Sequence, residues 1–113
     1  MLCILCLLLS CKKIPADRQL QLKLVYNGQT ASHIQTQLYR HYLSRLGGWR
    51  NDWVATGISD LNGRILFSGL PKAIYYIEAS GTSSLTGEWI KANTLVYLND
   101  ASLLVEETVN LTK

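Results

Sequence analysis

Cysteine and histidine are the residues here best suited to chemistry, and their spacing predicts no metal site. All three cysteines fall early, at Cys3, Cys6 and Cys11, and the histidines are His33 and His41. A zinc site needs further cysteine or histidine at ligand spacing, and a disulfide scaffold distributes its cysteines through the folded region. We therefore expect no metal and no cofactor, and we interpret both histidines as surface residues.

The acidic residues also lack a catalytic arrangement. Of the eight Asp and Glu residues, only Glu106 and Glu107 are adjacent. Neighbours on a strand point to opposite faces, so these two carboxyl groups cannot flank one bond. No glycine-rich phosphate loop occurs in the sequence. We therefore predict that the protein is not an enzyme, and a small enzyme of unknown class is the least favoured alternative.

Aromatic and arginine side chains gather in one stretch of fifteen residues. Its members are Tyr39, Arg40, His41, Tyr42, Arg45, Trp49, Arg50 and Trp53. Aromatic rings beside guanidinium groups suit sugars, peptides and partner-protein surfaces, so we predict a partner-binding region here. The alternative is that the rings pack over an open end of the fold while the arginines are solvated. Solvent exposure of Trp49 and Trp53 would favour binding, and burial of both would favour a structural role.

Composition and charge limit the class of protein. The chain has 113 residues, of which 48% are hydrophobic and 17% charged, so it is long enough for one domain and too apolar to be disordered. The formal net charge is +3, and the basic residues are spread over several segments without a nucleic-acid-binding motif. We therefore expect no nucleic-acid partner.

The first residues have the pattern of an export signal. Cys3 to Leu9 form an apolar run that is too short to span a bilayer and fits the core of a signal peptide. Leu8-Leu9-Ser10-Cys11 resembles the bacterial lipobox, which implies a diacylglycerol on the sulfur of Cys11 and cleavage before it. We therefore predict a signal peptide at residues 1–10 and a lipidated tether at residues 11–18. The alternative is an apolar first strand or helix of the domain.

From Gln19 onward the apolar period is two, which is typical of half-buried strands. Leu20, Leu22, Leu24 and Tyr26 should face a core, and so should Ile65 with Phe67 and Tyr75 with Ile77 and Ala79. Asn27-Gly28 and Asp60-Leu61-Asn62-Gly63 are turn signals, and we interpret residues 40–52 as a strand extension followed by a loop. The pattern predicts an all-β fold, a seven-stranded antiparallel sandwich covering residues 19–113.

The central third of the chain resembles a known fold. Asp60-x-x-Gly63-x-x-x-Phe67-x-x-Leu70-Pro71, followed by Tyr75-x-Ile77-x-Ala79, is similar to the transthyretin-like Greek-key fold. Carboxypeptidase regulatory-like domains and collagen-adhesin B-type repeats share that fold, as do modules of outer-membrane lipoproteins. The resemblance implies a Greek-key sandwich in which Phe67, Leu70 and Tyr75 fill one end of the core. Adhesin repeats often carry a Lys-to-Asn isopeptide bond that is catalysed by an acidic residue and needs these side chains buried together. Lys23 and Glu78 could supply the lysine and the acid, but the strand period places both toward water.

These patterns lead to two functional hypotheses. The first is a non-enzymatic interaction module of the cell envelope that is anchored in the outer membrane by lipid on Cys11. Such a module would present residues 40–53 to a protein or glycan partner. The alternative is a structural spacer, or an accessory subunit of a surface assembly such as a pilus, without a ligand of its own.

Overall fold

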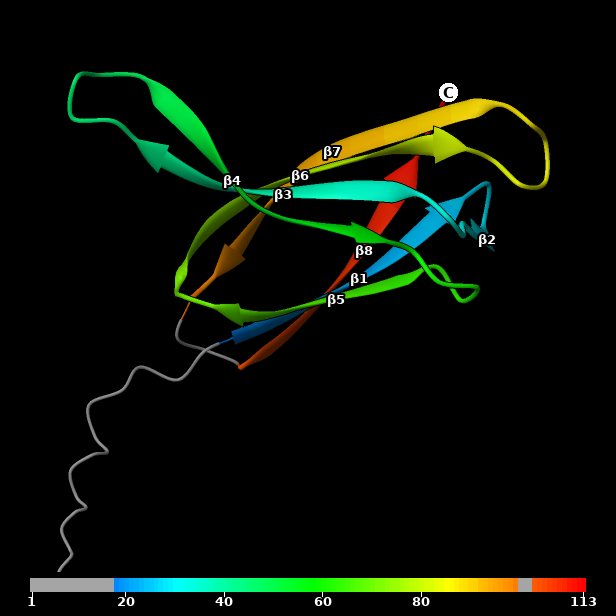
Figure 1. Ribbon diagram of the computed structural model, residues 1–113, viewed down its shortest axis with the longest axis horizontal. Coiled ribbons are helices and arrows are strands. Elements are labelled where there is room, and N and C mark those ends of the chain that lie inside the picture. The colour runs from blue at the N-terminus through cyan, green and yellow to red at the C-terminus, as the bar shows by residue number, and fades with distance from the viewer. Residues whose placement is uncertain (1–17, 100–102) are drawn as a thin grey trace, which may run out of the picture.

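Alternating apolar residues form strands along most of the described chain (Figure 1). The computed structural model of the protein describes residues 18–99 and 103–113. The strands are β1 Arg18–Tyr26, β2 Gln29–Thr30, β3 Gln35–Leu43, β4 Trp49–Ile58, β5 Arg64–Leu70, β6 Ala73–Thr82, β7 Trp89–Leu98 and β8 Leu104–Leu111. Within these ranges there is no helix with the length and apolar character needed to cross a bilayer. The predicted signal segment and Cys11 lie outside the described residues.

The strands form two sheets that pack face to face, which confirms the predicted all-β sandwich. One sheet has β1 at its centre, with β5 and the short β2 on one side and β8 on the other. The second sheet has the order β4-β3-β6-β7. There are eight strands rather than seven, because the Asn27-Gly28 turn folds Gln29 and Thr30 back onto the end of β1.

One strand pair departs from the predicted antiparallel arrangement. β8 runs parallel to β1, with registers from Gln19 opposite Leu104 to Tyr26 opposite Leu111. Parallel neighbours require a crossover connection. Here β7, in the other sheet, returns the chain to the end where β1 begins, so β8 starts beside the start of β1.

The core consists of the side chains that the period of two places between the sheets. Leu20, Leu22 and Leu24 of β1 are fully buried, as is Ile77 of β6. Ile65, Phe67, Leu70, Tyr75 and Ala79 are also buried, as the sequence predicts. Full burial of one such aliphatic side chain contributes about 1.5–3 kcal/mol. The fold therefore rests on apolar contacts between two layers.

The turn between β4 and β5 is held by Asp60. Its carboxylate accepts the backbone N–H groups of Asn62 at 2.8 Å and Arg64 at 3.0 Å, and Gly63 has a positive φ of 73°. The N–H of Arg64, followed by that of Asn62, lowers the pKa of Asp60 below its ordinary value of 3.8. These bonds favour the ionised carboxylate, so the turn is stabilised above the unfolded pKa.

We predict that this contribution to stability is lost in acid. As the pH falls through the lowered pKa of Asp60, the folded state must take up a proton and the free energy of unfolding decreases. Asp60→Asn keeps an acceptor oxygen but removes the titrating group. Urea unfolding at a series of pH values below about 4 should therefore show a shallower decline for Asp60→Asn than for the native sequence. Parallel profiles for the two proteins would contradict this role of Asp60.

Thr36 of β3 is the polar exception inside the core. Its side chain is fully buried, and its Oγ1 has no hydrogen-bond partner within the described ranges. A buried hydroxyl without a partner carries a desolvation cost. We expect Thr36→Val to raise the free energy of unfolding by about 1 kcal/mol, measured as a higher urea midpoint at unchanged m-value. A lower midpoint would show that the hydroxyl makes a bond on which the sandwich depends.

The segment from residue 40 to residue 52 differs from its predicted form. The loop is limited to residues 44–48, because β3 continues to Leu43 and pairs there with Trp49 at the start of β4. β1 also begins one residue early, at Arg18, which the sequence assigned to the tether. Arg18 is largely buried, and its Nε donates to the carbonyl of Asn99 at 2.6 Å. β6 continues to Thr82, so the connection to β7 starts at Ser83.

Candidate functional site

The predicted binding region lies on the β3–β4 hairpin, and the hairpin divides it between two faces. The side chain of Trp53 donates from Nε1 to Gln37 Oε1 at 2.9 Å, and the ring of His41 stacks on Trp49 with centroids 4.7 Å apart and planes at 4°. Tyr39 packs against Tyr76 of β6 with ring centroids 5.9 Å apart. These contacts all lie on the outer surface of the β4-β3-β6-β7 sheet.

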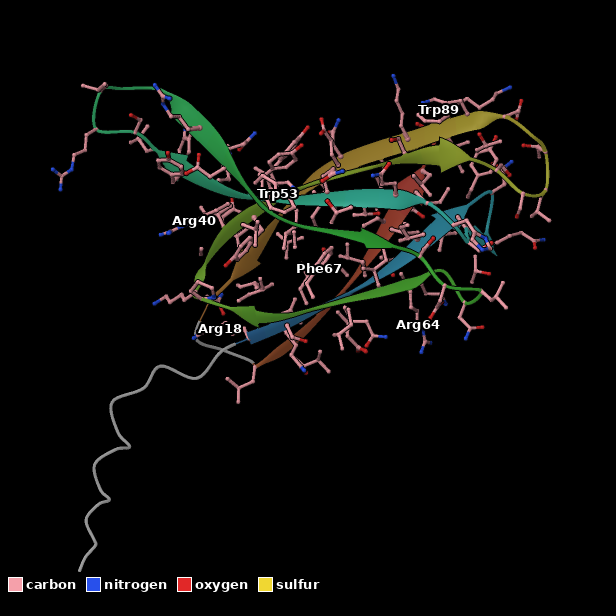
Figure 2. The ribbon with its side chains drawn as sticks, in the orientation of Figure 1. Arg18, Arg40, Trp53, Arg64, Phe67 and Trp89 are labelled. Carbon is pink, nitrogen blue, oxygen red and sulfur yellow. The ribbon has the colours of Figure 1, made fainter. Side chains whose placement is uncertain are left out.

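The arginines of the same region lie elsewhere. Arg40 alternates with Tyr39 and His41 along β3, and Figure 2 shows it on the inner side of the sheet, away from Trp53. Tyr42 of β3 and Arg50 of β4 are register partners. They alternate with the outward-facing His41 and Trp49, so they lie on the same side of the hairpin as Arg40. Burial raises the pKa of Tyr75, and the charges of Arg40 and Arg18 oppose that shift, which places both cations near the inner side. Arg45 is exposed in the loop.

Strand register assembles an apolar row across the outer face of this sheet. Tyr39 lies opposite Trp53 on one side and opposite Tyr76 on the other, and Tyr76 lies opposite Leu95 of β7. The next row pairs His41 with Ile74 and Ile74 with Tyr97. We call this surface the aromatic face, and its members are Tyr39, His41, Trp49, Trp53, Ile74, Tyr76, Leu95 and Tyr97.

A polar row borders the aromatic face. It contains Thr56, Gln37, Glu78 and Asn93, which are register partners across the four strands. Thr56 Oγ1 donates to Gln37 Oε1 at 2.6 Å, and Tyr39 Oη donates to Glu78 Oε1 at 3.3 Å. An open groove continues along this row toward Ser80 and Lys91. Hydrogen-bonding groups thus lie directly beside the exposed rings.

Tyr39 and Tyr76 of the aromatic face remain protonated at neutral pH. Burial raises the pKa of Tyr39, and the negative charge and hydrogen bond of Glu78 raise it further. Burial is also the largest cause of the raised pKa of Tyr76, followed by the charge of Glu78. Both phenols therefore act as neutral rings with a hydrogen-bonding edge, the form that suits partner surfaces.

Exposure distinguishes the two interpretations of the tryptophans. Trp49 is 59% exposed and Trp53 is 61% exposed, so neither packs over the end of the core. Tyr97 is 62% exposed and Leu95 40% exposed on the neighbouring β7. A contiguous exposed apolar surface of this kind is typical of interaction sites. Exposure of both tryptophans is the outcome expected for a binding surface, and binding itself stays a prediction.

Four members of the aromatic face were missed by the sequence prediction. Ile74, Tyr76, Leu95 and Tyr97 lie far along the chain from residues 39–53. The available signal was strand alternation: Tyr76 follows the inward Tyr75, and Tyr97 lies between the inward Val96 and Leu98. These outward positions carry large apolar side chains where a solvated face would carry polar ones.

Metal-binding and covalent chemistry find no support in the described ranges. Within residues 18–99 and 103–113, no group of three or more His, Cys, Asp or Glu side chains could hold a metal ion. His33 contacts Ser32 Oγ at 3.3 Å, and His41 is stacked on Trp49, so the two histidines do not form a pair. Lys23 and Glu78 are exposed, as the strand period predicts, and so is Asn110, whereas an isopeptide bond would need the three residues buried together.

Comparisons with solved structures support the fold. The pilus 2b backbone protein of group B streptococcus has a TM-score of 0.61 at 17% identity, over 86% of this chain and 41% of that protein. BcpA, the major pilin subunit of Bacillus cereus, has a TM-score of 0.59 at 20% identity, over 88% of this chain and 31% of that one. Transthyretin from Sparus aurata has a TM-score of 0.52 at 17% identity, over 82% of this chain and 93% of that one.

These matches show a sandwich like those of transthyretin and of pilin domains, as the resemblance implied. The chain spans less than half the length of either pilus protein that it matches. No protein-family model matches the sequence, and no curated protein matches it.

Proposed function

We propose that this protein is a non-enzymatic accessory subunit of a bacterial surface assembly, held to the outer membrane by lipid on Cys11. The observation that carries the proposal is the exposed aromatic face, which a subunit would bury against the neighbouring component. Large aromatic side chains supply most of the binding energy at such contacts. The fold supports the kind of assembly, because pilus backbone and major pilin proteins contain sandwiches of the same form.

The parallel β1–β8 pair fits a structural role. β1 starts at one end of the sandwich and β8 finishes at the other, with the strands paired over their whole length (Figure 1). A pulling force applied between Arg18 and Leu111 would therefore load the hydrogen bonds between these strands in shear. In that geometry all of the bonds oppose the force at once. Bonds between parallel strands are evenly spaced, which distributes such a load. This geometry suits a module that transmits force within an assembly.

The experiment is cross-linking of the full chain in its native envelope, followed by sizing of the complexes. We expect the native sequence in a complex much larger than the monomer, and Trp53→Ala combined with Tyr76→Ala should release most of it. Truncating a central aromatic contact typically weakens an interface by about 2 kcal/mol or more, which is about thirtyfold. The matched control is Trp89→Ala, because Trp89 is 60% exposed but lies at the far end of β7. Monomeric native protein, or equal release by all variants, would contradict the proposal.

The lipid anchor is tested separately. Cells fed radioactive palmitate should label the native chain but not Cys11→Ala, because the acyl groups would be carried by that cysteine. Cys3→Ala is the control, since Cys3 lies within the predicted signal peptide. Equal labelling of the native chain and Cys11→Ala would remove the anchor from the proposal and leave the aromatic face as its basis.

A second candidate function is glycan binding by the same face. The observation that favours it is the polar row of Gln37, Glu78 and Asn93 beside Tyr39 and Trp53. Sugars present apolar C–H faces to rings and hydroxyl groups to amides and carboxylates. Retardation of the full chain in gels containing neutral polysaccharide, lost in Trp53→Ala and kept in Trp89→Ala, would support this function. Equal migration with and without polysaccharide would contradict it.

A further inference from the structure

The end of the β3–β4 hairpin projects beyond the rest of the sandwich (Figure 1). β3 pairs with β6 only as far as His41, and past that point β3 and β4 pair only with each other. We call residues 43–50 the hairpin tip. The tip is held by a short turn, in which Gly47 N–H donates to Ser44 O at 3.0 Å and Ser44 N–H donates to Gly48 O at 2.9 Å.

The hairpin tip combines exposed apolar side chains with positive charge. Leu46 is 91% exposed at the turn, and Leu43 and Trp49 flank it at 61% and 59% exposed. Arg45 and Arg50 are also exposed on the tip, Arg50 on the opposite face of the hairpin from Leu43 and Trp49, and no Asp or Glu occurs from residue 40 to residue 51. Leu46 and Trp49 thus leave apolar surface in water at a structured turn, and the neighbouring arginines favour an anionic environment.

We propose that the hairpin tip inserts into the headgroup region of an anionic phospholipid bilayer. Leu46 and Trp49 enter the membrane–water interface, a region that tryptophan side chains prefer to both bulk water and the hydrocarbon core. Arg45 and Arg50 pair with lipid phosphates, which guanidinium groups bind through two parallel hydrogen bonds. The tip therefore acts as a membrane contact that is separate from Cys11 and that adjoins the aromatic face through Trp49, which belongs to both.

If the hairpin tip enters the bilayer, the end of the sandwich that carries the tip must face the anionic membrane surface. Arg18, Arg40, Arg45, Arg50 and Lys72 lie toward the end that carries the tip, and among the described ranges the acidic residues Asp52 and Glu106 also lie in that half of the sandwich. At the opposite end, Glu88 accepts from Tyr26 Oη at 2.8 Å and forms an ion pair with Lys113 at 2.9 Å. The cationic end is thus the one that complements an anionic surface.

The start of the described chain lies at this same end. Arg18 pairs with Leu70 and bonds to Asn99, and Ile74 pairs with His41 at the base of the hairpin. Figure 2 shows Arg18 and Arg40 toward one end of the sandwich, and Arg64 and Trp89 toward the other. Cys11 is seven residues before Arg18, a chain length of at most about 25 Å. This orientation argument rests on the proposed lipid anchor, whereas the tip's composition does not.

The test is quenching of tryptophan fluorescence by lipids brominated in their acyl chains. The full chain is reconstituted into vesicles of brominated phosphatidylglycerol and phosphatidylethanolamine in two forms. Trp53→Phe with Trp89→Phe retains Trp49, and Trp49→Phe with Trp53→Phe retains Trp89, which has nearly the same exposure. We expect Trp49 emission to be quenched severalfold and shifted to the blue, and Trp89 emission to remain unchanged. Equal quenching of the two tryptophans, or no quenching of Trp49, would overturn the proposal.

A second arm tests the arginines. An arginine near an anionic surface strengthens binding about fivefold. Arg45→Gln with Arg50→Gln should therefore reduce the quenching of Trp49 strongly, while Arg64→Gln, on β5 at the opposite end, should not. Vesicles lacking phosphatidylglycerol should reproduce the effect of the double variant. Quenching of Trp49 that does not change with the arginine substitutions or with lipid charge would overturn the proposal. Failure of the native chain to incorporate palmitate would overturn only the lipid anchor.

Discussion

Replacing Phe67 with alanine is expected to lower the free energy of unfolding by about 3–5 kcal/mol, the largest single effect we predict. Phe67 is 6% exposed and belongs to β5, in the sheet that contains β1. Its ring reaches across to β4 in the other sheet, where a Cβ added at Gly57 would lie 3.3 Å from Phe67 Cζ. Truncation would therefore leave a cavity between the two layers, and backbone at Gly57 could not fill it.

Urea unfolding of the two proteins measures this difference directly. The matched control is Leu66→Ala, because Leu66 is the neighbouring residue on β5 but is 54% exposed on the outer surface. We expect that variant to change stability by less than about 1 kcal/mol. If Phe67→Ala cost no more than Leu66→Ala, the two faces of β5 would be assigned incorrectly and the sandwich core would lie elsewhere.

The second large effect is expected at Gly63, where alanine should cost about 2–4 kcal/mol. Gly63 has a positive φ of 73°, and a Cβ there would lie 2.7 Å from the carbonyl oxygen of Leu24. The backbone cannot move away easily, because Leu24 N–H donates to the Gly63 carbonyl at 2.7 Å. Alanine would thus combine backbone strain with a clash against the central strand β1.

Gly28→Ala separates these two causes. Gly28 also has a positive φ, of 77°, but no atom lies within 4 Å of a Cβ placed there. Only the cost of the left-handed backbone remains, about 1–2 kcal/mol. Thermal or urea unfolding should therefore rank Gly63→Ala well below Gly28→Ala in stability. Equal costs would mean that the turn after Asp60 does not press against β1 as described.

The sandwich itself could be predicted from local patterns. Leu20, Leu22 and Leu24 alternate with polar residues, which places them on one face of a strand without reference to any other segment. The turn at Asp60 is also local, because its acceptor, its donors and the required glycine lie within five residues. Strand identity and burial follow from such short-range information, and the structure confirms both.

The aromatic face could not be predicted in the same way, because strand register assembles it. Tyr39, Tyr76 and Leu95 become neighbours only when β3, β6 and β7 pair in one register. A β-bulge in β4 also determines which side chains reach this face, and no turn residue in the sequence indicates it. Leu38 pairs with Ala55 and Tyr39 with Trp53, so Val54 is the extra residue and the side-chain alternation of β4 reverses there. Without it, Trp53 and Ala55 would share a face, and the tryptophan would point toward the core.

The parallel pairing of β8 with β1 was not predicted, for a related reason. The residues of β8 alternate as they would in an antiparallel strand, so their pattern says nothing of strand direction. Direction depends on how the chain crosses from the second sheet back to the first. That long-range choice also places the start of β1 and the end of β8 at opposite ends of the module, which is the geometry used in the functional proposal.

Oxidative footprinting of the full chain, purified and in its native envelope, tests the central claim that the aromatic face contacts a neighbouring component. Tyr75 is 1% exposed and should be protected in both samples, while Trp89 at the far end of β7 should react equally in both. We predict that Trp53 and Tyr76 react in the purified protein and become several times less reactive in the envelope. Unchanged reactivity of Trp53 and Tyr76 on transfer to the envelope would contradict the account.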